Sequence, residues 1–103
     1  MGDAGTALLR ALRAMLEGAG ALVVEEVRSR RWASVTFAGA RHELALRLEG
    51  DGAEAAAARF VAGLDAAEFA LAGHIVADIA LVAEERRRGC ARLRIEALTV
   101  EDD

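Results

Sequence analysis

Two segments of this 103-residue chain alternate apolar and polar residues with a period of two. In RHELALRLE, residues 41–49, every second residue of the central part is leucine, and the residues between are mostly charged. The segment ARLRIEALTVE, residues 91–101, repeats the pattern through Leu93 and Ile95. Successive side chains of a strand point to opposite faces, so each segment predicts a strand with one buried face. The phase changes near Leu98, which indicates a bulge or a second buried face.

Each of these strands has a predicted neighbour. RWASVTFA, residues 31–38, also alternates, and Gly39-Ala40 then turns the chain, so it forms a β-hairpin with 41–49. HIVADIALVAE, residues 74–84, is apolar on one side and half apolar on the other, and it pairs with 91–101. ALVVEEVR, residues 21–28, is rich in β-branched residues and predicts a further strand, although a helical continuation is an open alternative.

Two segments have the helical period instead. Residues 4–17 place their leucines on one face, and Asp3 or Thr6 can cap the start of this helix. The alanine-rich segment AEAAAARFVAGL follows Asp51, and Asp51 with Glu54 resembles a capping box. We therefore expect a second helix directly after the first hairpin.

The predicted order of elements is α-β-β-β-α-β-β, in a single α+β domain over residues 1–103. We expect a two-layer sandwich, with a mostly antiparallel sheet of four or five strands and both helices on one face. If 21–28 is not a separate strand, the chain becomes a helix-hairpin repeat of 4–50 and 51–101. A chain of this length can bury one core without disulfides or metals.

Composition limits the location and the partners of the protein. Cys90 is the one cysteine, and the first residues lack the basic and apolar stretches of a secretory signal, so we expect a cytoplasmic protein. No apolar run approaches the ~20 residues that span a bilayer. The net charge of −4 makes nucleic acid an unlikely partner. The abundance of alanine and the absence of lysine, asparagine and glutamine are typical of a GC-rich bacterial genome.

Arginines gather in two glutamate-containing stretches, EEVRSRRW at 25–32 and EERRRGCARLR at 84–94. If each element crosses the sheet once, the chain reverses direction at 28–31 and again at 86–90. Counting the reversals between these two turns places both at the same end of the sheet. Such an end can bind an acidic partner or a phosphate, whereas in the alternative reading each glutamate pair neutralises its own arginines in a solvated turn. Cys90 then lies beside the arginines without a catalytic role. The possible anion-binding residues are Arg28, Arg30, Arg31, Arg86, Arg87 and Arg88.

The two histidines suggest a possible small-molecule site formed by His42, His74 and Asp78. His42 is in phase with the leucines of its strand, so it points toward the core face or its rim. His74 and Asp78 share one face of a regular strand but lie ~13 Å apart, beyond direct contact. The sequence lacks the Cys pairs and HExxH spacing of metal sites and the glycine-rich motifs of nucleotide sites. We therefore expect no metal and no cofactor.

The combination of FAGARHELALRLEG, AGHIVADIALVAEE and a terminal ALTVED resembles a family of short bacterial proteins of unknown function. The resemblance covers nearly the whole chain and implies an independently folded protein without implying an activity. The order of elements is also similar to that of type III secretion chaperones, which are small, acidic and dimeric, but the final helix of those proteins is missing here.

These observations favour a non-catalytic interaction or binding module over an enzyme. With 54% hydrophobic residues, the sheet is expected to have an apolar open face that needs a cover. Pairing of faces or edges between two copies supplies one, and twofold homodimers are the commonest assemblies. We therefore expect a homodimer, with an unknown protein as a further possible partner. Anion or nucleic-acid binding through the arginines, and a small-molecule enzyme or carrier using His42 or His74, remain the alternatives.

Overall fold

The computed structural model describes residues 3–18 and 20–102. It confirms the expected α+β architecture of two layers, with four antiparallel strands in the order β1-β2-β4-β3. A helix followed by a hairpin occurs twice along the chain. The elements are α1 (Ala4–Met15), β1 (Ala21–Ala33), β2 (Ala38–Glu49), α2 (Ala53–Leu64), β3 (His74–Arg87) and β4 (Cys90–Glu101).

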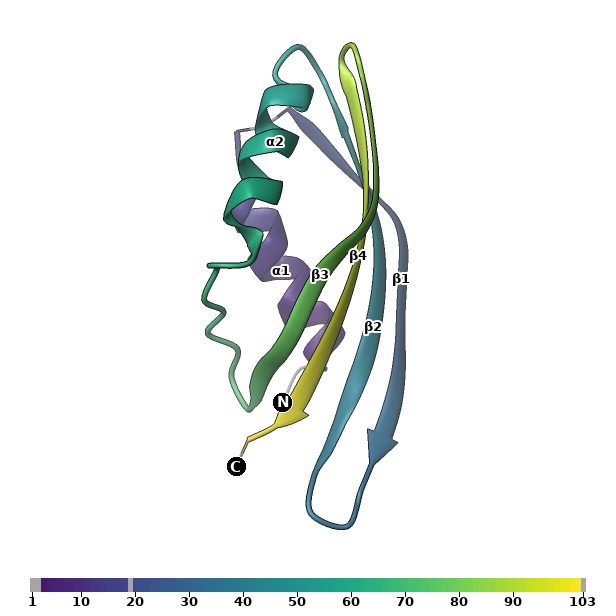
Figure 1. Cartoon of the computed structure of the whole chain (residues 1–103), viewed down its shortest axis with the longest axis vertical. Helices are drawn as coiled ribbons and strands as arrows, with labels where there is room; N and C mark the ends of the chain where they lie inside the picture. The colour runs from purple at the N-terminus through teal and green to yellow at the C-terminus, as the bar shows by residue number, and fades with distance from the viewer. Residues whose placement is uncertain (1–2, 19, 103) are drawn as a thin grey trace.

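Both helices pack on one face of the sheet (Figure 1), and the core lies between the two layers. The two central strands supply most of its sheet side, because their apolar residues mostly point toward the helices. The helices supply leucines, small alanines and Phe60. The alternation of the sequence therefore gives the correct buried face for both central strands. The fully buried large apolar residues are Leu8, Leu12, Leu44, Leu46, Leu48, Leu93 and Ile95.

The two helices begin differently. Asp3 caps α1, since its Oδ1 accepts a hydrogen bond of 2.8 Å from the Thr6 backbone N–H. The expected capping box at α2 is wrong, because Gly52 is the N-cap and no side chain there caps the helix. The carboxylate of Glu54 instead accepts a 3.1 Å hydrogen bond from the backbone N–H of Gly89. This bond ties α2 to the turn between β3 and β4.

One predicted chain reversal is absent. Residues 21–33 form the single strand β1, so the expected break at 28–31 is wrong, and three expected strands between the helices become two. The chain turns at residues 34–37 and not at Gly39-Ala40. In this turn the Ser34 N–H donates a hydrogen bond of 2.7 Å to the Phe37 carbonyl. Ser34 Oγ accepts a second bond, from the Phe37 N–H at 3.0 Å. An edge strand that is half exposed and rich in arginine lacks the apolar alternation by which strands are recognised.

Strand β3 contains two irregularities, between Val76 and Asp78 and between Leu81 and Ala83. A β-bulge adds one residue to a strand and reverses the faces of the residues that follow. Val76 lies opposite buried Thr99, but Asp78 lies opposite Leu98 on the other face. The regular alternation expected for 74–84 is therefore wrong.

The face of the sheet that carries no helix is charged rather than apolar. Its residues on the central strands are mostly arginine and glutamate, and they are mainly exposed. The expected apolar open face is wrong because much of the hydrophobic fraction is alanine, which packs in the helices and the core. We call this surface the outer face; its charged residues on β2 and β4 are Arg41, Glu43, Arg47, Glu49, Arg92, Arg94 and Glu96.

Candidate functional site

The structure separates the two arginine clusters. Across the strands, Arg28 is level with Glu96 of β4, because both lie opposite Glu43 of β2. Arg86 lies opposite Ala91, five residues away near the other end of β4. Five residues of strand correspond to ~17 Å along the sheet. The expectation that both clusters share one end is wrong, because β1 passes through 28–31 without reversing. The role of these arginines in anion binding stays a prediction.

Glutamates of the same strands neutralise several of these arginines. Arg28 lies 2.6 Å from Glu26. Near the turn between β3 and β4, Arg87 lies 2.7 Å from Glu85, and Arg86 donates bonds of 2.8 and 3.1 Å to the carboxylate of Glu84. The hydrogen bond to Glu84 raises the pKa of Arg86 above its usual value. The stretch 84–94 is therefore a hairpin whose charges are partly compensated by its own glutamates, whereas Arg92 and Arg94 pair with Glu25 and Glu26 of β1.

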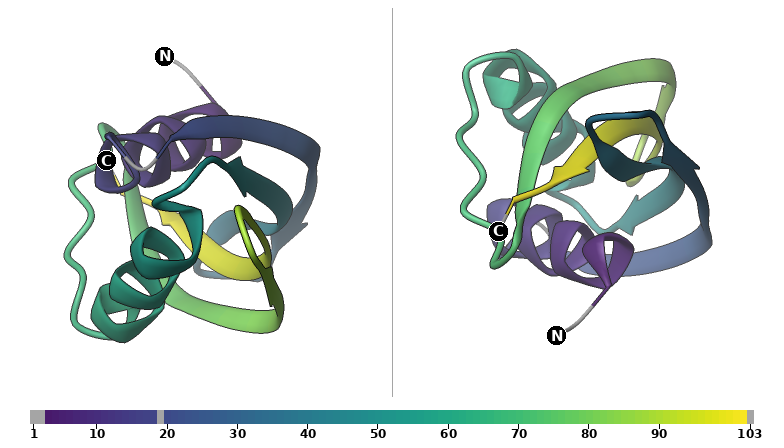
Figure 2. Two further views of the ribbon diagram at one scale, coloured as in Figure 1. Left: turned by 90° about the horizontal axis from the view of Figure 1, so that it is seen from above. Right: turned by 90° about the horizontal axis from the view of Figure 1, so that it is seen from below.

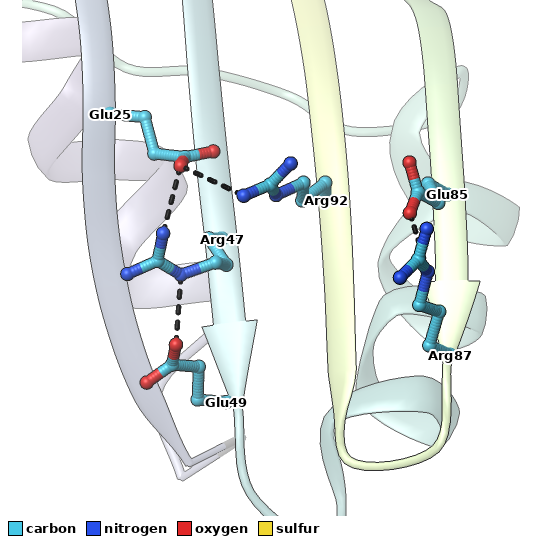
Figure 3. A network of polar contacts seen from close by, with 6 residues as sticks. All are labelled: Glu25, Arg47, Glu49, Glu85, Arg87 and Arg92. Atoms are coloured by element: carbon cyan, nitrogen blue, oxygen red, sulfur yellow. Dashed lines mark hydrogen bonds and ion pairs between the residues drawn. The ribbon is translucent and has the colours of Figure 1, made fainter.

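A larger ionic network crosses the outer face of the sheet (Figure 3). Arg47 of β2 lies between two carboxylates, 2.9 Å from Glu25 of β1 and 2.9 Å from Glu49. Glu25 also lies 3.7 Å from Arg92 of β4. The side chains of Arg47 and Glu25 are only 27% and 29% exposed, so this network is better shielded from solvent than the pair of Arg87 with Glu85. It links three strands.

His42 lies on the helix-facing side of β2 and is only 1% exposed. Its Nδ1 lies 2.7 Å from Ser29 Oγ of β1, and its Nε2 lies 2.9 Å from Thr99 Oγ1 of β4. The Thr99 hydroxyl donates to the Ala40 carbonyl, so its oxygen accepts from the Nε2–H of His42. Nδ1 is then the acceptor for the Ser29 hydroxyl. Burial lowers the pKa of His42, which favours this neutral form.

The contact between Ser29 and His42 has the geometry of a nucleophile next to a base. In hydrolytic triads a carboxylate orients the second ring nitrogen of the histidine and stabilises its charged form. Here the hydroxyl of Thr99 occupies that position, and no carboxylate in the part of the chain that the structure describes is hydrogen-bonded to His42. The arrangement therefore matches a satisfied buried polar cluster. Thr99 was missed from the sequence, although it is in phase with the apolar residues Ile95 and Ala97.

No pocket among the described residues holds all three residues of the predicted small-molecule site, although His42 and Asp78 both line a pocket of about 560 Å³ beside Arg28 and Arg30. His42 and His74 line one pocket of about 650 Å³, beside the start of α1, together with Asp3 and Glu101. Both ring nitrogens of His74 are buried, and neither has a hydrogen-bond partner among the described residues. Asp78 lies on the outer face because of the bulge that follows Val76. The placement of His74 and Asp78 on one face was therefore wrong.

Within 3–18 and 20–102, His, Cys, Asp and Glu form no group of three or more that could hold a metal ion. None of the described helices is long and apolar enough to cross a bilayer.

The most exposed apolar side chains lie at the turn between β1 and β2. Val35 is fully exposed and Phe37 is 59% exposed. This hairpin extends past the C-terminal end of β4 (Figure 1), in a molecule that measures 47 by 22 by 20 Å. The nearby Trp32 ring packs over Gly39, where an added Cβ would lie 2.9 Å from the Trp32 Cζ2. We call residues 34–37 the hairpin tip. The sequence does not reveal it, because the alternation of residues 31–38 predicts a strand there.

Comparison with known proteins gives a fold and no family. No family model matches the chain, and no curated protein matches it either. A solved chain with a similar fold belongs to the structure described as "Virion of native gene transfer agent (GTA) particle". It has 21% sequence identity and a TM-score of 0.55, and the match covers 91% of this chain and 89% of that chain. The chain thus shares its fold with a component of that particle.

Proposed function

We propose that this protein is a non-catalytic assembly module that associates with a second copy of itself and docks through its hairpin tip on another protein. The observation that carries the proposal is the exposure of Val35 and Phe37 on a turn held by its own hydrogen bonds. Apolar side chains that project from a folded domain are favourable binding elements, because a partner removes them from water.

Two further observations support this function. The buried histidine has its hydrogen bonds satisfied by Ser29 and Thr99, so its chemistry is accounted for by the fold. The fold is similar to that of a chain in a virion particle, which favours a structural role within a larger assembly. We place this assembly in the reducing cytoplasm of a bacterium, in keeping with the free thiol of Cys90.

Site-specific photocrosslinking in cells tests the proposal. A photoreactive phenylalanine analogue replaces Val35 at the hairpin tip, and in a control protein it replaces Val82, which is 51% exposed on β3. We expect irradiation to produce covalent adducts larger than the 10.9 kDa chain at position 35 and far fewer at position 82. Mass spectrometry of the adducts identifies the protein that is bound. Recovery of the unmodified monomer alone at position 35 would contradict docking through the tip.

Polar replacement of the tip provides a matched test. Phe37→Ser should reduce the adduct at position 35 while leaving the melting temperature nearly unchanged, because Phe37 is mostly exposed. The equivalent replacement Val82→Ser should leave the adduct at its original level. Equal adduct formation in both variants would show that the contact at position 35 is not specific.

A further inference from the structure

Strand β1 is an edge of the sheet with one irregularity, a register shift between Val24 and Glu26. Its pairing with β2 continues without a register shift from Glu26 to Ala33. Along this stretch the backbone groups that point away from β2 have no backbone partner in residues 3–18 and 20–102. Seen from above, β1 forms the border of the sheet on the side of α1 (Figure 2). An edge of this kind can add another strand.

The opposite edge is less suitable. Strand β3 contains two bulges within fourteen residues, after Val76 and after Leu81. Bulges interrupt the row of backbone donors and acceptors and twist an edge away from a flat partner, so they are a common protection against unwanted pairing. Between the two edges, β1 offers the longer uninterrupted template.

The charges of β1 change sign at Val27. Two glutamates, Glu25 and Glu26, precede this residue, and three arginines follow it, at 28, 30 and 31. In antiparallel pairing about a twofold axis, the first half of one strand lies against the second half of the other. With the axis at Val27, Glu26 of each copy lies opposite Arg28 of the other copy, and the two valines lie opposite one another.

Glu26 and Arg28 already pair within one chain, 2.6 Å apart, but two other side chains at this edge have unused binding capacity. Val27 is 40% exposed, so a copy of itself would cover apolar surface. Arg30 lies directly opposite Arg41 across β1 and β2, and like charges in that position are unfavourable. Neither arginine has an ion-pair partner among the described side chains. In the twofold pairing Arg30 lies opposite Val24 of the second copy, and Glu26 of that copy is its diagonal neighbour.

We propose that two copies of this chain join their β1 strands antiparallel about a twofold axis at Val27, forming one continuous eight-stranded sheet. This inference rests on the self-association part of the proposed function and names the surface and the register. The axis is perpendicular to the sheet, so the helices of both copies lie on the same face. The two hairpin tips then point in opposite directions and remain free to bind another protein.

Charge reversal with rescue tests the pairing by sedimentation velocity over a concentration series. Arg28→Glu places two glutamates opposite each other, and Glu26→Arg places two arginines opposite each other. We expect each variant to raise the dimer dissociation constant about tenfold or more. The double variant Glu26→Arg/Arg28→Glu restores opposite charges and should return the constant close to that of the wild type. Arg87→Glu, an equal charge change at the far hairpin, is the control and should have little effect.

Disulfide trapping gives an independent measure of the register. In a Cys90→Ser background, Val27→Cys should form an intermolecular disulfide on mild oxidation, because directly opposite Cβ atoms lie ~4.5–5.5 Å apart. Val82→Cys on β3 should remain reduced under the same conditions. Circular dichroism checks that every variant has kept its fold.

The outcomes separate this inference from the proposed function. The β1 pairing would be overturned, with self-association left standing, by either of two results. One is a wild-type dimer whose dissociation constant does not change in either charge reversal. The other is a Val27→Cys variant that traps no more dimer than Val82→Cys. A purely monomeric wild-type protein at about 100 μM would overturn self-association as well. Adducts at position 35 with another protein should persist in Arg28→Glu, since the tip lies outside the paired edge.

Discussion

Ser29 Oγ of β1 lies 2.7 Å from Nδ1 of His42 on β2, and the other ring nitrogen of His42 bonds to Thr99 of β4. One imidazole therefore joins three neighbouring strands on the buried side of the sheet. Loss of a buried group that satisfies two partners costs both hydrogen bonds and packing. His42 is thus expected to be a major contributor to stability although it has no catalytic partner among the residues described.

Replacement of His42 by alanine should lower the free energy of unfolding by ~2–4 kcal/mol, because it leaves a cavity and an unpaired hydroxyl in the core. Urea unfolding followed by far-UV circular dichroism measures the change. His74→Ala is the matched control, since His74 is only partly buried and makes no side-chain hydrogen bond within the described residues. An equal loss in the two variants would contradict the structural role of the His42 cluster.

The stability of the protein should decrease as the pH falls below about 6.5. Burial lowers the pKa of His42 in the folded state below its ordinary value of 6.5, so the unfolded chain binds a proton more readily. The stability contributed by the neutral imidazole is fully present above 6.5 and is lost as the pH falls from there toward the folded pKa. Urea midpoints measured between pH 5 and 8 should show this slope in the wild type. The slope should be smaller in His42→Ala, and a slope of equal size there would assign it to other groups.

Gly39 should tolerate no side chain. A Cβ at this position would clash with the Thr99 carbonyl and lie 2.9 Å from the Trp32 ring. Gly39→Ala is therefore expected to lower the free energy of unfolding by ~1–3 kcal/mol, as overpacking does elsewhere. Gly63→Ala in α2 meets no atom within 4 Å and should raise stability by ~0.5–1 kcal/mol, because alanine is the better helix former. Thermal unfolding should shift in opposite directions for the two variants.

The outer-face network should contribute more to stability than the exposed pair of Arg87 with Glu85. Arg47 is 27% exposed between Glu25 and Glu49, and its removal leaves two carboxylates without their shared cation. We expect Arg47→Ala to cost ~1–2 kcal/mol, and Arg87→Ala, whose side chain is 77% exposed, to cost ~0–0.5 kcal/mol. Raising the salt concentration should change the free energy of unfolding of Arg87→Ala and of the wild type by the same amount. Equal losses for the two variants would show that the network adds nothing to an exposed ion pair.

The sequence by itself determined the layers of this protein. The period of two in 41–49 and 91–101 was sufficient to identify the two central strands and their buried faces. The period of the leucines in 4–17 was likewise sufficient for the first helix. These patterns are local, because a side chain on a strand or helix must point either toward the core or away from it. The partial self-neutralisation of the hairpin at 84–94 could also be predicted, since Glu84 and Glu85 lie close to Arg86 and Arg87 along the chain.

The tertiary structure decided which residues meet. The bulge after Val76 moved Asp78 away from the face of His74, and the uninterrupted β1 separated Arg28 from Arg86. Ser29 and Thr99 reached His42 through pairing across three strands, in a register that no single segment encodes. Local periodicity records whether a side chain is buried. Bulges, strand continuity and register depend on contacts between distant segments, and these form only when the sheet closes on its helices.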